Sequence, residues 1–164
     1  MTPSEFRDRI LHPGLTVLYA LGGPRPSLEA ERLLLAIAGQ ESGMAHRYQV
    51  LSGGRAGPAR GWWQFESGGG VAGVMAHQSS GGLARRLADH CAVRWDQAAI
   101  WRALEGHDTL AAGFARLLLW TDPRPLPATE TDGWACYLRN WRPGKPHPDA
   151  WGKHWAAARA ALGL

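Results

Sequence analysis

Cysteine is scarce and long apolar runs are absent, and each of these features excludes a class of protein. The 164 residues include only Cys91 and Cys136, which are too few for a disulfide framework or a zinc-ligand pattern. We expect both thiols to be buried as small hydrophobic side chains. No apolar run approaches the roughly 18 residues of a membrane-spanning helix, so we expect no membrane insertion.

A secretory signal is lacking as well. The segment from Met1 to Gly14, MTPSEFRDRILHPG, carries acidic side chains and has no continuous apolar core. We therefore expect a soluble chain that is made in the cytoplasm. If it acts outside the cytoplasm, another agent must deliver it.

Basic residues exceed acidic ones, and most of them are arginine. The net charge is +4 and the pI is near 9.6, a balance that suits an anionic cell-wall polymer, nucleic acid or membrane surface. The basic residues are scattered rather than clustered on one helix face, so we do not expect a nucleic-acid partner. The apolar content of 45% and the length predict one domain, residues 1–164.

Apolar residues recur at helical spacing, and no segment has the alternation and turns of a β-hairpin, so we predict an all-α fold. Ser4, Ser27 and Asp96 are the expected caps, and Pro13-Gly14 is expected to stop a helix. The helix near residues 108–119 is apolar enough to be the central buried one. The predicted helices cover about 4–11, 15–21, 27–42, 71–78, 81–92, 96–104, 108–119, 131–139 and 148–162.

Two segments interrupt this pattern. Residues 53–70, GGRAGPARGWWQFESGGG, are rich in glycine yet hold three aromatic side chains, which predicts an ordered, functional loop with one helical turn at 62–65. Residues 121–130 carry three prolines and predict an extended connector within the domain.

Glu41 is the residue most suited to chemistry. Leu34, Ile37 and Glu41 fall at i, i+3 and i+7, so the carboxylate shares the apolar face of its helix. Partial burial raises a carboxyl pKa, as a general acid for glycosidic cleavage requires. The alternative is a Glu41 side chain that turns into solvent or pairs with Arg47 or Arg60.

Four segments downstream of one another resemble soluble lytic transglycosylases of the lysozyme-like superfamily. They are QESG at 40–43, Ser52, GPARGWWQF at 57–65 and the region 137–144, which follow that family's order of Glu-Ser, a serine, Gly-x-Ala-x-Gly-x-x-Gln and a Tyr-Asn motif. The close match runs from residue 40 to residue 65. The resemblance implies a single lysozyme-like all-α catalytic domain.

The same resemblance implies a role for each matching residue. Glu41 would be the acid and base, and Ser42 the neighbouring polar residue. Gln64 would contact the sugar beside the scissile bond, while Tyr137 would be the active-site tyrosine and Asn140 its polar companion. Gly61 would let the backbone approach the glycan closely.

This chain departs from the family pattern in three places. Residues 46–57 lengthen the distance between Glu41 and Gln64, and Asn140 follows Tyr137 by three positions instead of one. Trp62-Trp63 replaces the commoner Leu-Met. The tryptophan pair either anchors the loop in the core or, with Phe65 beside it, contributes a ring to substrate binding.

Nine tryptophans are many for a chain of this length, and flat aromatic faces stack on sugar rings. Those near the motifs predict a glycan groove, whereas the others are expected to make helix contacts. The groove candidates are Trp62, Trp63, Trp120 and Trp141, and the packing candidates are Trp95, Trp101, Trp151 and Trp155.

Glu66 is the other carboxylate close to the loop, and its role decides the reaction type. With Glu41 alone, Glu41 protonates the leaving oxygen and then deprotonates the C6 hydroxyl of the sugar, giving a 1,6-anhydro product without water. With Glu66 recruited as a second carboxylate, hydrolysis becomes possible. We expect Glu66 to be a solvated charge.

The sequence therefore predicts a monomeric peptidoglycan lytic transglycosylase that cleaves the β-1,4 bond between MurNAc and GlcNAc. Its architecture favours a phage endolysin or virion-associated lysin that reaches the periplasm or cell wall by holin-type release or virion delivery. The alternatives are a muramidase and a non-catalytic glycan-binding or structural module. No metal or cofactor is expected, because the helical histidines lack ligand partners; these are His77, His90, His107 and His154.

Overall fold

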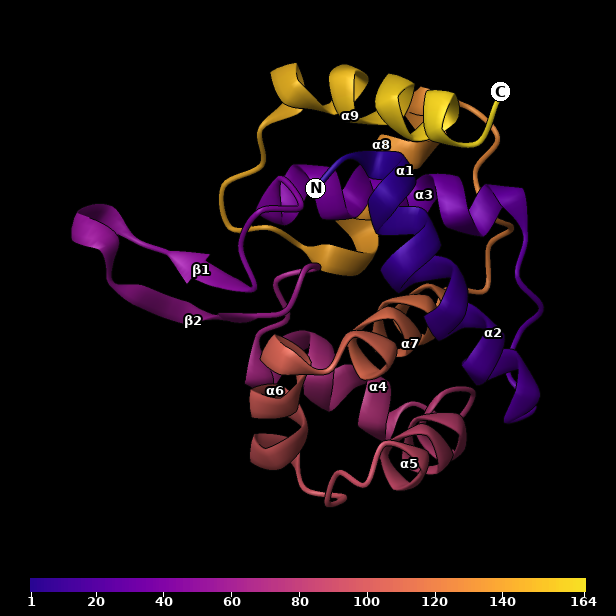
Figure 1. The fold of residues 1–164 in the computed structure, drawn as a ribbon, viewed down its shortest axis with the longest axis vertical. Helices are drawn as coiled ribbons and strands as arrows, with labels where there is room; N and C mark the ends of the chain where they lie inside the picture. The colour runs from indigo at the N-terminus through magenta and orange to yellow at the C-terminus, as the bar shows by residue number, and fades with distance from the viewer.

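The computed structural model describes residues 1–164 as a mostly helical protein with one two-stranded sheet (Figure 1). None of its helices is both long and apolar enough to cross a membrane. The helices are α1 (Pro3–Phe6), α2 (His12–Ala20), α3 (Leu28–Ser42), α4 (Ala72–Ala76), α5 (Gly81–His90), α6 (Gln97–Gly106), α7 (Asp108–Trp120), α8 (Glu130–Trp141) and α9 (Pro148–Ala161), and the strands are β1 (Tyr48–Val50) and β2 (Ala56–Arg60).

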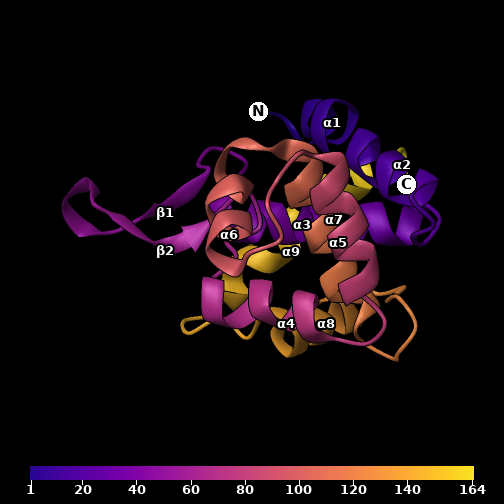
Figure 2. The same cartoon turned by 90° about the horizontal axis from the view of Figure 1, so that it is seen from below.

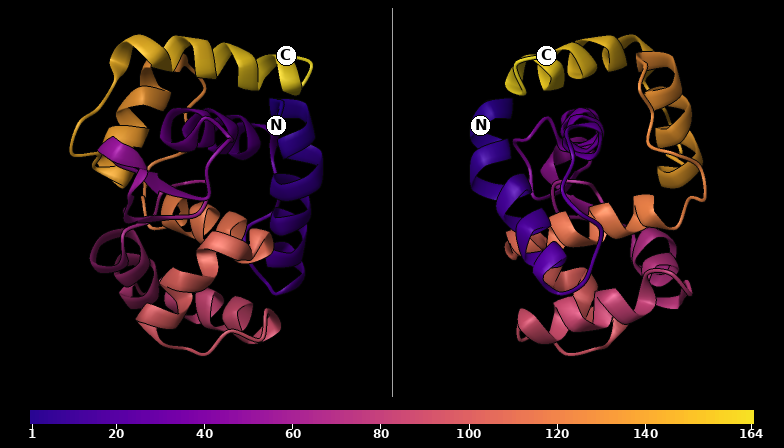
Figure 3. Two further views of the ribbon diagram at one scale, coloured as in Figure 1. Left: turned by 60° about the vertical axis from the view of Figure 1, so that its left-hand side comes forward. Right: turned by 90° about the vertical axis from the view of Figure 1, so that its right-hand side faces the viewer.

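Helices α3 and α7 form the centre of the molecule. Every residue of α7 from Leu110 to Leu119 is buried, which confirms the prediction of a central apolar helix at 108–119. Helix α3 is buried over most of its length, and α9 lies along it with α1 and α2 at one side and α8 at the other (Figure 3). A Cβ at Gly39 would overlap His154, so glycine permits this close approach of α3 and α9.

The expected caps of two later helices are confirmed. Ser27 Oγ accepts a 3.2 Å hydrogen bond from the Ala30 amide at the start of α3, and Asp96 accepts one of 2.9 Å from Ala99 at the start of α6. Helix α3 ends at Gly43, whose φ of 60° is the left-handed conformation typical of a helix end. The end of α3 therefore holds Glu41 at a fixed position.

The N-terminal helices differ from the prediction. The chain stays helical from Pro3 to Ala20, so Pro13-Gly14 does not stop it, and Thr2 rather than Ser4 is the cap. A π-helical turn over Arg7–Leu11 precedes the proline. This wider turn displaces the carbonyl groups that the proline ring would otherwise meet, so the helix continues.

The β-hairpin is the element that the all-α prediction missed. Tyr48 pairs with Arg60 and Val50 with Ala56 in an antiparallel arrangement that projects from the helical body beside α6 (Figures 1 and 2). The strands are short and β2 contains Gly57-Pro58, so they lack the usual β-strand pattern. The Trp101 indole N–H of α6 donates to the Pro58 carbonyl at 2.9 Å and holds the base of the hairpin.

The residues after the hairpin form a tight turn instead of the predicted helical turn at 62–65. Gly61 has a φ of 76° and Gln64 a φ of 50°, and Arg60 and Phe65 exchange two backbone hydrogen bonds that close the turn. A Cβ at Gly61 would crowd the Leu104 carbonyl. The expected role of Gly61 toward the glycan is therefore wrong, since its backbone packs on α6.

Candidate active site

A cleft of about 950 Å³ lies between the end of α3, the base of the hairpin, the glycine-rich turn and the loop that joins α8 to α9. Its volume is within the usual range for ligand sites. Polar side chains predominate in its lining, and five of the predicted site residues contribute to it. These five are Glu41, Gln64, Phe65, Tyr137 and Asn140, and Glu66 and Trp141 line it as well.

Glu41 and Tyr137 meet inside this cleft. The Tyr137 hydroxyl donates a 2.6 Å hydrogen bond to Glu41 Oε1, although 96 residues separate the two in the chain. The Tyr137 ring is only 2% exposed and stacks on Trp151 of α9, with 5.4 Å between ring centroids and 15° between planes. Packing of α8 on α9 therefore fixes the hydroxyl that contacts the carboxylate.

Burial raises the pKa of Glu41 from its ordinary value of 4.5 to about 7. The hydrogen bond from Tyr137 opposes this shift by stabilising the charged form, and the negative charge of Glu66 adds to it. A carboxyl group with a pKa near neutrality can donate a proton and later accept one. Glu41 therefore has the acid strength that a catalytic acid and base requires.

The alternative ion pairs for Glu41 do not form. Arg47 binds Asp108 through both guanidinium nitrogens, at 2.5 and 3.0 Å. Arg60 pairs with Glu105 at 3.0 Å. Both arginines are thus engaged near α6 and α7, and Glu41 is left with Tyr137 as its hydrogen-bond partner.

Gln64 and Asn140 lie in the cleft as predicted. Gln64 adopts a left-handed backbone conformation, and its side-chain amide donates to the Gly61 carbonyl at 2.9 Å. Such strain at a non-glycine residue is typical of functional positions. The Asn140 amide donates to Asp122 and to the Cys136 carbonyl, each at 2.9 Å, so its orientation is fixed.

Ser42 does not face the cleft. It is 9% exposed, and its hydroxyl donates to the Ala38 carbonyl at 3.0 Å while accepting from the Met44 amide at 3.2 Å. The hydroxyl is occupied in closing the end of α3. The predicted role of Ser42 in substrate binding is therefore wrong, because in the last turn of α3 its hydroxyl points toward the helix backbone.

Trp62 and Trp63 are core residues, and the structure contradicts a sugar-stacking role for either ring. The Trp63 ring is fully buried, and its N–H donates to the Leu34 carbonyl at 2.9 Å. Trp62 donates to Asp108 at 2.9 Å, and both rings pack edge-on against Phe6. The pair anchors the turn that presents Gln64, which was the other interpretation of these residues.

Other aromatic predictions have mixed outcomes. Trp141 lines the cleft half-buried, and Phe65 packs edge-on against it while lining the same cleft. Trp120 is 46% exposed and does not line the cleft, so its predicted place in the groove is wrong. Trp151 and Trp155 are buried in helix packing, as predicted.

Ser52 lies at the exposed tip of the hairpin, in a short 3-10 turn, and is not among the residues that line the cleft. The serine of the family motif therefore has no counterpart beside Glu41 at this position. Of the cysteines, Cys136 is buried as expected and Cys91 is partly exposed, and both are free thiols.

No protein family, curated protein or solved structure matches this chain. The resemblance to soluble lytic transglycosylases therefore rests on the motifs themselves.

Side chains that hold a metal ion usually come in groups of three or more, and no such group of histidine, cysteine, aspartate or glutamate occurs in this protein. Asp122 is a site residue that the sequence analysis missed. It binds Arg139 at 2.6 Å and Asn140 at 2.9 Å, and so orients both beside the cleft. Its position in the proline-rich connector gave no indication of this role.

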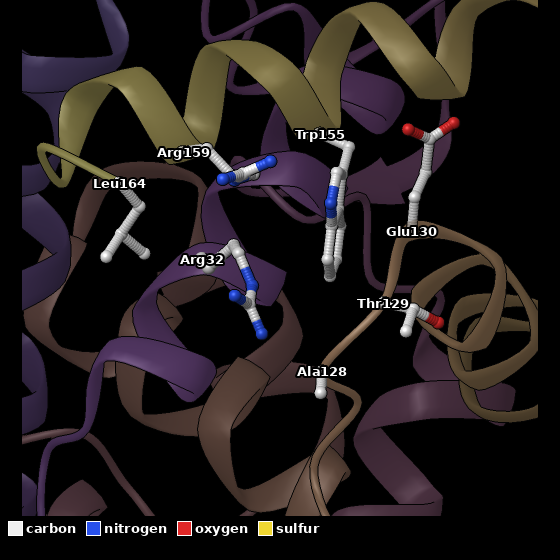
Figure 4. Close-up of a pocket in the computed structure, with 7 residues that line it drawn as sticks. All are labelled: Arg32, Ala128, Thr129, Glu130, Trp155, Arg159 and Leu164. Atoms are coloured by element: carbon white, nitrogen blue, oxygen red, sulfur yellow. The ribbon is translucent and has the colours of Figure 1, made fainter.

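A second cavity, of about 390 Å³, lies where α3 and α9 meet the start of α8 (Figure 4). Arg32 and Arg159 reach into it beside the ring of Trp155. The Arg32 guanidinium lies 4.8 Å from the centre of that ring and donates to the Pro127 carbonyl at 2.8 Å. This cavity gathers guanidinium groups instead of a buried acid, so we assign the chemistry to the larger cleft.

Proposed function

We propose that this protein is a peptidoglycan lytic transglycosylase in which Glu41 acts alone as acid and then as base. The observation that carries the proposal is the half-buried Glu41 carboxyl in an open cleft, hydrogen-bonded by Tyr137 and with a pKa near 7. The fold we propose for it is lysozyme-like. The place of action is the bacterial cell wall, reached by holin-type release or virion delivery.

In the first step, protonated Glu41 donates its proton to the glycosidic oxygen as the bond from that oxygen to C1 of MurNAc breaks. The carbonyl oxygen of the substrate's own acetamido group attacks C1 and forms a cyclic oxazolinium ion. Glu41 is now a carboxylate, and the Tyr137 hydroxyl stabilises that charge by its hydrogen bond.

In the second step, the Glu41 carboxylate takes the proton from the C6 hydroxyl of the same sugar. The C6 oxygen attacks C1, the acetamido oxygen leaves, and a 1,6-anhydro sugar results. The enzyme is returned to its starting protonation state without consuming water. One carboxyl group with a pKa near neutrality serves both steps.

Hydrolysis is the second candidate reaction, and the presence of Glu66 in the cleft supports it. Glu66 lines the same cleft and lies close enough for its charge to raise the pKa of Glu41. A second carboxylate in the cleft could activate water on the opposite face of the sugar. Glu66 is exposed, as expected for a solvated charge, so we favour transglycosylation.

The direct test is digestion of purified peptidoglycan by the wild type, by Glu41→Gln and by Glu29→Gln. Glu29 is an exposed acid at the other end of α3 and serves as the matched control. We expect the control to release soluble fragments like the wild type. Glu41→Gln should lose activity by about 100- to 10,000-fold, since it can neither give nor take a proton.

Undiminished release by Glu41→Gln would contradict the proposal. A folded wild type that binds peptidoglycan but releases nothing would support the alternative of a non-catalytic glycan-binding module. Binding is read separately, by sedimentation of the protein with insoluble peptidoglycan.

A further inference from the structure

The loop that joins α8 to α9 places unpaired cations on the rim of the cleft. Arg142 and Lys145 both line the cleft, are exposed, and form no ion pair. Arg139 also lines it, but Asp122 neutralises its charge at 2.6 Å. Two free positive charges therefore face whatever occupies this end of the cleft.

The backbone at Arg142 gives an independent indication of function. Arg142 ends α8 with φ 49° and ψ 51°, the left-handed conformation that usually falls to glycine. The loop has a glycine at 144, where no such conformation is required. Glycine would adopt this backbone conformation without strain, whereas arginine does so at a cost. Such strain at a non-glycine residue is typical of binding sites.

The acidic residues of the cleft limit the ligand chemistry. Glu41 and Glu66 are the carboxylates that line the cleft, and they belong to the end of α3 and to the glycine-rich turn rather than to the α8–α9 loop. A neutral sugar chain would gain little from two exposed cations. A glycan that carries carboxylate groups would gain from both.

We infer that Arg142 and Lys145 bind the carboxylates of the peptide stems that project from MurNAc, so that the preferred substrate is a peptide-bearing, anionic glycan strand. This inference rests on the proposed function and specifies its substrate. Carboxylates on such glycans have two sources, the stem peptide and, on MurNAc residues that lack a stem, the free lactyl group, and the substrates below distinguish them.

The test compares the double variant Arg142→Gln/Lys145→Gln with the matched double variant Arg85→Gln/Lys153→Gln. Arg85 on α5 and Lys153 on α9 are exposed, form no ion pair and do not line the cleft. The substrates are native peptidoglycan, amidase-stripped strands that keep only the lactyl carboxylate, and peptidoglycan whose carboxylates are converted to amides. Fragment release and cosedimentation are measured at low and at physiological salt.

We expect the rim variant to lose about tenfold in kcat/KM on native peptidoglycan at low salt, mainly through KM, and less at physiological salt. On the amidated substrate it should equal the wild type, which is itself slower there. The Arg85/Lys153 control should match the wild type throughout. A similar loss on stripped strands would assign the contact to the lactyl carboxylate and overturn the stem-peptide assignment.

Arg142→Gly separates binding from folding, because glycine relaxes the left-handed backbone. It should bind native peptidoglycan more weakly than the wild type without a lower Tm. Equal cleavage of native and amidated peptidoglycan by the wild type would overturn the inference. A wild type that cleaves none of the substrates would contradict the proposed function, while cosedimentation would still test the inference.

Discussion

Glu41 is held between two opposing influences, burial that favours its neutral form and a tyrosine hydroxyl that favours its charge. The balance matters because the proposed reaction uses both forms in turn. A fully solvated carboxyl would be ionised near neutral pH. One without Tyr137 would have a still higher pKa and would give up its proton less readily in the first step.

Tyr137→Phe should disturb this balance in a defined direction. The hydroxyl lowers the pKa of Glu41, so its removal raises that pKa further. Because the first step needs protonated Glu41, the alkaline limb of the kcat/KM profile should move to higher pH by about one unit, the equivalent of one hydrogen bond. A limb that stays in place would show that Tyr137 does not act on the carboxyl.

The raised pKa of Glu41 also predicts how stability depends on pH. Between pH 4.5 and about 7 the folded protein holds a proton that the unfolded chain has lost, so the free energy of unfolding falls as pH rises through this range. Glutamine does not titrate. Glu41→Gln should therefore match the wild type near pH 4 and exceed it at pH 8, by on the order of 2 to 3 kcal/mol.

Urea unfolding at several pH values measures this difference directly, and it requires no substrate. Glu29→Gln serves as the control, because the pKa of Glu29 is lowered by hydrogen bonds at the start of α3. Its stability relative to the wild type should not improve as pH rises. A constant difference between Glu41→Gln and the wild type would contradict a raised pKa.

Sequence patterns identified three residues that line the cleft, but they did not predict the direction in which neighbouring side chains point. Helical spacing placed Glu41 on an apolar face, and the motif added Tyr137 and Gln64, all of which line the cleft. Ser42 and Trp63 belong to the same motif segments but face the interior. The difference lies in which neighbours pack on each side, and local sequence does not encode that.

At the scale of elements, the contact of α8 with α9 supports the site. Gly133 of α8 lies against the ring of Trp155, where a Cβ would overlap the indole. Tyr137 follows one helical turn later on the same face of α8 and stacks on Trp151 of α9. The spacing between these helices therefore sets the position of the hydroxyl that contacts Glu41.

Gly133→Ala should force the two helices apart. We expect a loss of about 1 to 3 kcal/mol in the free energy of unfolding, the usual cost of overpacking a core, together with weaker activity as Tyr137 moves. Gly82→Ala in α5 is the matched control, since a Cβ there meets nothing within 4 Å. The control should be neutral or slightly stabilising. Equal stabilities for the two variants would contradict this account of the packing.

Helix ends were predictable where a side chain caps the backbone, as at Ser27 and Asp96. The prediction that Pro13 would end the helix was wrong, because a π-helical turn before it accommodates the proline ring. No residue propensity indicates such a turn. The hairpin escaped prediction because its strands are short and one contains Gly-Pro. Contacts with α6 hold it, so tertiary packing rather than local preference forms it.

At the scale of the whole molecule, the cleft joins parts that are distant in sequence. The end of α3, the turn around Gln64 and the middle of α8 meet only because α3, α7 and α9 pack in one core. Composition and periodicity predicted the mostly helical class. The assembly of the cleft could not be read from periodicity, and only the order of the motifs indicated it.

Glu66 lines this assembled cleft together with Glu41, and Glu66→Gln tests whether it takes part in the reaction. Removing its charge relieves the repulsion that raises the pKa of Glu41, so the alkaline limb of the kcat/KM profile should move slightly to lower pH. Fragment release and the identity of the products should be unchanged. Loss of activity would instead favour the two-carboxylate hydrolysis.

The central claim is that Glu41 acts first as acid and then as base on the substrate itself, without water. Digestion of peptidoglycan in water enriched in oxygen-18, followed by mass spectrometry of the released fragments, tests it most directly. The claim predicts 1,6-anhydro ends that carry no label, produced by the wild type and not by Glu41→Gln. Reducing ends that carry oxygen-18 would contradict it and establish hydrolysis.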